Sequence, residues 1–229
     1  MTTEDLLTER IANIRREMEE ASEGRYPAPR LIAVTKTHPP EMILPLKAAG
    51  ITEIGENRVQ EIRQKLPELA GNFRIHLIGR LQRNKVRQIV GDVCMIQSVD
   101  SLSLAEEIHK RSLMANRIMP VLVEVSPAGE KQKGGVPMNE VRSFLKTIAP
   151  LEGLKVKGLM AVMPDTDDRD YLDGLFRNMR ELFDRLKGES LRDIGMEELS
   201  MGMSGDYRLA ARRGATMVRV GSAIFGPRG

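Results

Sequence analysis

The sequence is poor in cysteine and in aromatic residues, and both shortages exclude classes of protein. It contains one cysteine, Cys94, so neither an intrachain disulfide nor a CxxC metal or redox motif can form. A single thiol fits a reducing compartment, and we expect a cytoplasmic protein. There is no tryptophan, and aromatic residues make up only 3% of the chain, so side chains on which nucleic-acid bases stack are scarce.

Long uncharged apolar runs are also missing. The amino-terminal segment, MTTEDLLTERIANIRREMEEA, carries charges throughout and has no apolar stretch long enough for a signal peptide or a membrane span. We therefore expect no membrane association.

Thr2 followed by Asp5 predicts a capping box at the start of an amphipathic helix. The apolar residues at helical spacing are Leu7, Ile11, Ile14 and Met18.

The charge balance is close to even. Lysine and arginine total 35 and aspartate and glutamate total 32, which gives a net charge of +3 and no polybasic surface. From the composition we therefore do not expect the protein to bind nucleic acid. One basic cluster within residues 80–87 keeps an RNA-binding alternative open, although a solvated helix beside a pocket also explains it. The cluster consists of Arg80, Arg83, Lys85 and Arg87.

Several familiar ligand motifs are missing or broken. No GxGxxG is present, and the Walker-like spacing from Gly221 to Gly226 meets Pro227 where that motif needs lysine. The acidic run 165–170 lacks the glycine and the glutamate of a calcium loop, so we expect it to cap a helix. The three histidines do not show HExxH spacing. We therefore predict no metal site.

Segments typical of buried strands alternate with segments of helical periodicity along the chain. This alternation predicts a parallel sheet with crossover helices, and its length favours a closed (β/α)8 barrel formed by one domain, residues 1–229. The expected strands are 31–34, 51–55, 73–79, 93–99, 118–125, 155–163, 199–201 and 217–220. The expected helices between them are 41–49, 57–70, 82–90, 102–114, 138–148, 171–186 and 207–213.

The first expected strand is followed by a lysine that needs an explanation. Leu31–Val34 is a continuous apolar run, typical of a strand buried on both faces, and Lys36 follows it before two prolines stop the strand. A lysine at a strand end is ordinarily solvated. In a barrel, however, the carboxyl ends of the strands are where the chemistry takes place.

Two glycine-containing turns follow the last two strands. Gly202, Ser204 and Gly205 precede an expected helix, and Gly221 and Ser222 end the final strand. Tight turns alone explain single glycines. Small residues and free amides in both turns together predict a phosphate site, which barrels often build after their last two strands.

Six sequence blocks resemble the pyridoxal phosphate homeostasis family of the YggS/PROSC type, in the same order and over essentially the full chain. They are AVTKT, GENRVQE, HLIGRLQRNK, GLMAVMP, LSMGMSGD and TMVRVGSAIFGPR. The resemblance implies a barrel similar to the N-terminal barrel of alanine racemase, with pyridoxal 5′-phosphate as cofactor, held as a Schiff base on Lys36. Because a Schiff base forms from a neutral amine, the pKa of this lysine has to fall from about 10.4, which burial can achieve.

The resemblance also implies roles for five further residues. Asn57 is expected in the pocket, Ser204 with the backbone around Gly221 and Ser222 at the phosphate, and Arg219 at the pyridine nitrogen. Because arginine donates hydrogen bonds and does not accept them, the ring nitrogen should stay unprotonated and the cofactor should be a poor electron sink. The chain departs from the family's usual tyrosine, proline, serine and asparagine at Arg58, Arg80, Arg83 and Glu124.

The expected function is control of the pyridoxal phosphate supply, in which the protein binds the cofactor without appreciable turnover and passes it to apo-enzymes. The second domain of alanine racemase, with its catalytic tyrosine, is not expected. Of His38, His76 and His109, only His76 is expected to line the barrel and to offer a general acid or base. An amino-acid racemase or lyase with the same Schiff base remains an alternative. We expect a monomer.

Overall fold

The strands of the protein form one parallel sheet that closes into a barrel. The computed structural model describes residues 2–129, 134–189, 191 and 194–226, so Pro227 lies outside the described residues. The strands are β1 (Arg30–Val34), β2 (Glu53–Glu56), β3 (Arg74–Leu77), β4 (Met95–Val99), β5 (Met119–Ser126), β6 (Val136–Pro137), β7 (Leu154–Ala161), β8 (Ile194–Ser200) and β9 (Met217–Val220).

The strand order shows how the barrel closes. It runs β4-β3-β2-β1-β9-β8-β7-β5-β6, and an additional pairing of β4 with β5 joins the two sides. Within the described residues, β6 is only a short side branch on β5, which leaves eight barrel strands, and all the pairings are parallel. The (β/α)8 barrel predicted from the alternation is therefore confirmed, and its strands all end at the same face.

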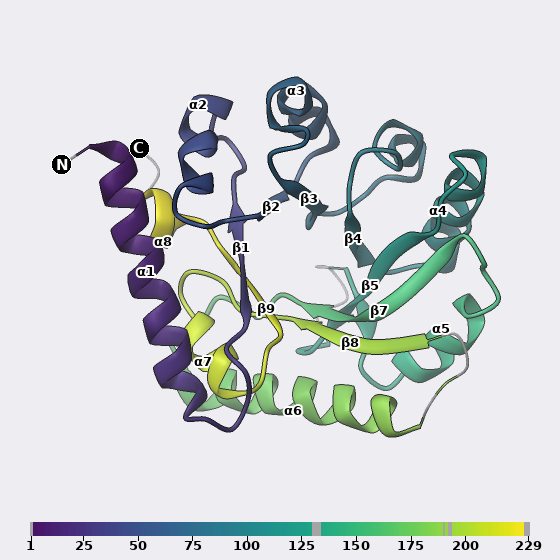
Figure 1. Cartoon of the computed structure of the whole chain (residues 1–229). Coiled ribbons are helices and arrows are strands. Elements are labelled where there is room, and N and C mark those ends of the chain that lie inside the picture. Colours follow the sequence, from purple (N-terminus) through teal and green to yellow (C-terminus); the bar gives the residue numbers. More distant parts are fainter. Residues whose placement is uncertain (1, 130–133, 190, 192–193, 227–229) are drawn as a thin grey trace.

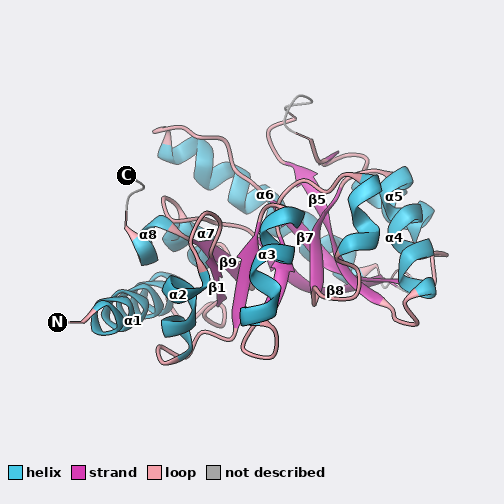
Figure 2. Ribbon diagram, turned by 90° about the horizontal axis from the view of Figure 1, so that it is seen from above, coloured by secondary structure: helices cyan, strands magenta, loops and turns pink. Residues whose placement is uncertain are grey.

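Helices surround the strands, as Figures 1 and 2 show from two directions. The α-helices are α1 (Thr3–Ser22), α2 (Pro40–Ile43), α3 (Val59–Leu69), α4 (Leu102–Met114), α5 (Val141–Ile148), α6 (Arg169–Gly188), α7 (Tyr207–Arg212) and α8 (Ser222–Phe225). Two 3₁₀ helices complete the set, η1 (Leu44–Lys47) and η2 (Arg83–Gln88). Among the described residues, no helix is both long and apolar enough to cross a membrane.

Helix α1 begins with the predicted capping box. The Asp5 amide donates to Thr2 Oγ1 at 3.1 Å, and the Thr2 amide donates to Asp5 Oδ2 at 2.8 Å. Its apolar face is buried against α7 and α8, so the start of the chain packs on the end of the chain (Figure 1). Arg10 Nη1 adds a hydrogen bond of 2.9 Å to the carbonyl oxygen of Ile224 in α8.

Several element boundaries differ from those predicted. The helix expected over 41–49 divides into α2 and η1, because Pro45 has no amide hydrogen with which to continue an α-helix. The basic helix expected over 82–90 is the shorter 3₁₀ helix η2. Strand β8 begins at Ile194, five residues before the expected 199, and both β6 and α8 were missed.

Two sets of apolar side chains form the core. The larger set fills the space between the strands and the surrounding helices. The smaller set comes from five different strands and therefore meets inside the barrel: Ile32, Met95, Leu122, Met160 and Met217. This packed interior supports a cavity at the carboxyl ends of the strands.

Candidate functional site

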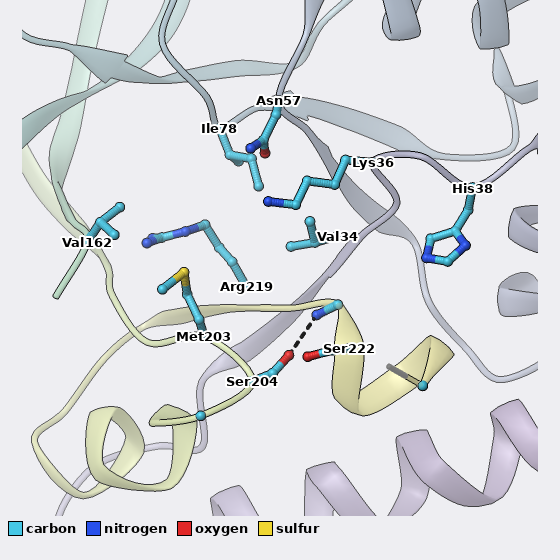
Figure 3. Close-up of a pocket in the computed structure, with 13 residues that line it drawn as sticks. Val34, Lys36, His38, Asn57, Ile78, Val162, Met203, Ser204, Arg219 and Ser222 are labelled. Carbon is cyan, nitrogen blue, oxygen red and sulfur yellow. Dashed lines mark hydrogen bonds between the residues drawn. The ribbon is translucent and has the colours of Figure 1, made fainter. Parts of the chain in front are cut away.

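A cavity of about 480 Å³ opens where the barrel strands end, and Figure 3 shows its lining residues. All six residues expected from the sequence line it: Lys36, Asn57, Ser204, Arg219, Gly221 and Ser222. The loops after β1, β2, β8 and β9 supply most of them, while Arg219 projects from β9 itself. Apolar walls come from Val34, Ile78, Val162 and Met203. The volume suits a small-molecule ligand.

Lys36 stands two residues beyond β1, and its side chain runs into the cavity. Figure 3 shows the amino end directed toward Ile78 and Asn57, with Val34 alongside. Buried strand residues precede it, since Ile32 and Ala33 are fully buried and Val34 is nearly so. The apolar strand therefore delivers an amine to a partly enclosed space with both apolar and polar walls.

The backbone before Lys36 is held by a buried ionic cluster outside the barrel wall. Thr35 Oγ1 donates to Glu56 Oε1 at 2.6 Å, and Lys65 Nζ donates to the Thr35 carbonyl at 2.9 Å and to Glu56 Oε1 at 2.8 Å. Burial raises the pKa of Glu56, against the effect of its bonds to Lys65 and Thr35. Within the described part of the chain, Glu56 Oε2 has no hydrogen-bond partner.

The backbone after Lys36 is held from the same helix, α3. Thr37 has a φ of 69°, in the left-handed region that β-branched residues rarely adopt. Its amide donates to Glu61 Oε2 at 2.7 Å, and Lys65 Nζ lies 3.1 Å from the same oxygen. Lys36 therefore sits between two fixed peptide units. Sequence reasoning missed Glu61 and Lys65, although their i,i+4 spacing on the expected helix was a signal of an ion pair.

The two glycine turns meet at Ser204. Ser204 Oγ accepts hydrogen bonds from the amides of Gly221 at 3.1 Å and Ala223 at 3.3 Å, the first of which is drawn in Figure 3. An oxygen that accepts two hydrogen bonds has filled its lone pairs, so the hydroxyl hydrogen is left to donate. Because Ser204 lines the cavity, this donor is available to a ligand there.

The expectation that the helix starts carry free amides was wrong at three positions. The amides of Asp206 and Tyr207 both donate to the Met203 carbonyl, because the turn closes on itself, and the Gly221 amide is occupied by Ser204. The glycines have packing roles as well. A Cβ on Gly202, whose φ is +94°, would stand 2.4 Å from the Ala210 Cβ.

Arg219 is almost fully buried in the wall of the cavity, with 4% of its surface exposed. Its Nη1 donates to Ser200 Oγ at 2.6 Å and its Nη2 to the Ala161 carbonyl at 2.8 Å. Burial lowers the pKa of the guanidinium to about 10, while Glu124 and Asp206 oppose the shift. Arg219 thus remains a cation at neutral pH, with its position fixed by two acceptors.

The histidines are placed partly as expected. His76 does lie inside the barrel, fully buried, but it is His38 that lines the cavity. The His38 ring stacks on Phe225 of α8 at a centroid distance of 4.0 Å. His109 accepts a hydrogen bond from the Gly153 amide at 2.9 Å. His38 was missed because its place depends on α8, which the sequence did not predict.

The departures from the family pattern lie around the cavity mouth. Arg58, Arg80 and Arg83 line a groove that also includes Asn57 and so adjoins the cavity. Glu124 lines a side pocket of about 270 Å³ that shares Val162 with the main cavity. Burial, and secondarily the charge of Asp100, raises the pKa of Glu124 to about 7.

The acidic run 165–170 forms a cap, as predicted. Asp168 Oδ1 accepts from the Tyr171 amide at 2.9 Å at the start of α6. Across the described residues, no group of three or more His, Cys, Asp or Glu side chains is placed to hold a metal ion. The polar groups that line the cavity are those of Lys36, His38, Asn57, Ser204, Arg219 and Ser222.

Comparisons with known proteins agree with this arrangement. Residues 7–229 match the alanine racemase, N-terminal domain family. A pyridoxal phosphate homeostasis protein of Aquifex aeolicus is 39% identical, with 95% of each chain covered. The chain therefore belongs to the pyridoxal phosphate homeostasis protein family.

Solved structures of PipY from Synechococcus elongatus share the fold. The form without PLP has a TM-score of 0.86 at 34% identity and covers 96% of this chain and 100% of its own. The form with PLP bound has a TM-score of 0.81 at 33% identity and covers 93% of this chain and 100% of its own. The family resemblance seen in the six sequence blocks is thus confirmed.

Proposed function

We propose that this chain is a single-domain, monomeric carrier that binds pyridoxal 5′-phosphate as a Schiff base on Lys36 and passes it to apo-enzymes in the cytoplasm. The observation that supports this most strongly is the convergence of Lys36, Ser204 and Arg219 on one cavity. One solved structure of the relative PipY has PLP bound. Pyridoxal phosphate supplies an aldehyde that condenses with an amine and a pyridine ring that can withdraw electrons.

The residues present fit this cofactor. Lys36 places an amine in the cavity for the aldehyde of the cofactor, and Arg219 places a cation there for its pyridine nitrogen. The Ser204 hydroxyl, already bonded to the amides of Gly221 and Ala223, has its hydrogen left for a phosphate oxygen. Val34 and Ile78 supply apolar contacts for a planar ring, and Asn57 a polar one.

Arg219 supports a binding role in preference to a catalytic one. The guanidinium is fixed by Ser200 and Ala161 and can only donate hydrogen bonds, so it would keep a facing pyridine nitrogen unprotonated. The ring would then stabilise a carbanion poorly, which disfavours racemase and lyase chemistry. Glu124, whose pKa is raised to about 7, can take up and release a proton near neutral pH. For this reason turnover has to be tested directly.

The attachment is tested by incubating the protein with pyridoxal phosphate, reducing it with borohydride and locating the adduct by mass spectrometry. We expect the adduct on Lys36 and its loss in Lys36→Ala. Lys85, which lines the neighbouring groove, serves as the comparison, because Lys85→Ala should leave the adduct unchanged. An adduct that persists on another lysine in both variants contradicts the proposed site.

The carrier role is tested separately from the attachment. The loaded protein is incubated with an apo-transaminase, and in parallel with single amino acids in deuterated water. Activation of the transaminase without deuterium at the α-carbons is the expected pair of results. Rapid α-deuteration supports the racemase or lyase alternative, and salt-sensitive RNA retention that is lost in Arg83→Ala/Arg87→Ala supports the RNA-binding one.

A further inference from the structure

A chain of polar side chains crosses the barrel interior beneath the cavity. It continues from Arg219 and Ser200, because Ser200 Oγ donates to Gln97 Oε1 at 2.7 Å. Gln97 Nε2 lies 3.0 Å from His76 Nδ1, and His76 Nε2 lies 3.4 Å from Glu53 Oε1. The five side chains come from β9, β8, β4, β3 and β2, and all are buried.

The apolar interior of the barrel makes these polar side chains depend on one another for hydrogen bonds. The rest of the barrel interior is apolar, including Ile32, Met160 and Met217. A buried polar group without a partner costs about 1 to 3 kcal/mol, so the hydrogen bonds that link Arg219, Ser200, Gln97 and His76 hold these side chains in place. Within the described residues, His76 Nε2 makes no hydrogen bond and only faces Glu53 at the ion-pair distance. Gln97 is the central link, since it contacts both Ser200 and His76.

Arg219 fixes the direction of the first hydrogen bond in this series of polar side chains. Because a guanidinium only donates, Ser200 Oγ has to accept from it, whichever way the next bond runs. When His76 is neutral, Ser200 donates to the Gln97 carbonyl and the Gln97 amide nitrogen donates to His76 Nδ1. His76 then carries its hydrogen on Nε2, toward Glu53.

Gln97 can also accept a hydrogen bond from a protonated His76. Burial lowers the pKa of His76, but its contacts with Cys94 and Glu53 outweigh burial and raise it to about 9. The cationic ring donates from Nδ1, and a half-turn of the Gln97 amide then presents oxygen to His76 and nitrogen to Ser200. Ser200 Oγ accepts from Arg219 in both arrangements, so the carboxamide preserves this contact.

We propose that Gln97 is a positioning residue: its bond to Ser200 fixes the place of Ser200 Oγ, the acceptor for Arg219 Nη1, and thereby aims the remaining N–H groups of Arg219 at the cavity. This inference rests on the proposed function, which places the pyridine nitrogen of the cofactor opposite Arg219. Gln97 itself is not among the cavity-lining residues and acts through Ser200.

The test compares two ligands in one variant. Gln97→Met nearly keeps the side-chain volume and removes the hydrogen bonds to Ser200, His76 and Met217. Binding is measured for pyridoxal phosphate and for its 1-deaza analogue, in which carbon replaces the ring nitrogen. The wild type should prefer pyridoxal phosphate, and the variant should lose about tenfold in that preference because a charge-assisted hydrogen bond becomes misdirected. The absorption band of bound pyridoxal phosphate should shift in the variant, whereas the band of the bound analogue should not.

Two further variants keep the test decisive. Ser200→Ala removes the acceptor next to Arg219 and should reduce the preference in the same way, even if Gln97→Met folds poorly. Met160→Leu changes an apolar side chain of the same barrel interior, next to Ser200, but removes none of the hydrogen bonds of the polar chain, so it should leave the preference unchanged. An equal loss for both ligands, or no loss in either variant, overturns the positioning role. A wild type that binds both ligands equally also overturns it, whereas one that binds neither contradicts the proposed function itself.

Discussion

The Thr37 amide donates a hydrogen bond of 2.7 Å to Glu61 Oε2, so helix α3 fixes the backbone one residue after Lys36. A left-handed φ of 69° at a threonine costs free energy and persists only where neighbouring contacts hold it. The Lys65 bond to the Thr35 carbonyl holds the other side. Lys36 therefore presents its amine from a prearranged loop.

Loss of this arrangement should slow attachment of the cofactor. In Glu61→Ala the Thr37 amide loses its acceptor, and we expect Schiff-base formation to slow about tenfold, because a hydrogen bond to a charged group contributes roughly 1.5 kcal/mol or more. Stopped-flow absorbance with pyridoxal phosphate measures the rate. Glu68→Ala, an exposed position on the same helix, is the matched control. Equal rates in the two variants would show that Glu61 does not position Lys36.

The phosphate contacts should depend on Ser204. Pyridoxal, which lacks the phosphate, should bind at least tenfold more weakly than pyridoxal phosphate, since contacts of about 1 to 3 kcal/mol each are lost. Ser204→Ala should reduce the difference in affinity between pyridoxal phosphate and pyridoxal. The substitution removes the hydroxyl donor and also the oxygen that accepts from the Gly221 and Ala223 amides. Titration calorimetry gives both affinities. Ser143→Ala, on α5, should keep the wild-type difference, and an unchanged difference in Ser204→Ala would rule out this phosphate site.

Glu124 should make stability fall with rising pH. Its pKa is raised to about 7 in the folded protein, so between the ordinary value of 4.5 and pH 7 the folded state holds a proton that the unfolded state has released. The free energy of unfolding therefore decreases across that window. Glu124→Gln cannot titrate and should gain roughly 1 to 3 kcal/mol relative to the wild type between pH 5 and pH 8. Urea unfolding at both pH values checks this, with the exposed Glu152→Gln as control. If the free energies of unfolding of Glu124→Gln and the wild type differed by the same amount at both pH values, Glu124 would not be the titrating group.

Gly202 should be required for folding in a way that Gly205 is not. An alanine at 202 combines a φ of +94° with a Cβ 2.4 Å from the Ala210 Cβ, whereas a Cβ at 205 meets nothing within 4 Å. We expect Gly202→Ala to lower the free energy of unfolding by about 2 to 4 kcal/mol and Gly205→Ala to change it by less than about 1. Chemical denaturation of the two variants is the measurement. Similar stabilities would mean that β8 and α7 shift apart at little cost.

The fold and the cavity residues could be predicted because they depend on local patterns. Apolar runs followed by Lys36, Asn57 or Gly221 mark strand ends, and the closed barrel brings all strand ends to one face. The supporting residues could not be predicted in this way. Glu61 and Lys65 act on the backbone of another element, and Gln97 meets Ser200 across 103 positions of sequence. Such contacts depend on the register of the strands, which no sequence motif records.

The order in which the residues appear along the chain has a consequence for synthesis. Lys36 and Asn57 emerge from the ribosome before Ser204, Arg219 and Gly221, which emerge together with the α8 helix that α1 covers. The early lysine cannot meet its phosphate-binding partners until the barrel has closed. Cofactor capture should therefore begin only after the barrel has closed, and it should give no assistance to the closure itself.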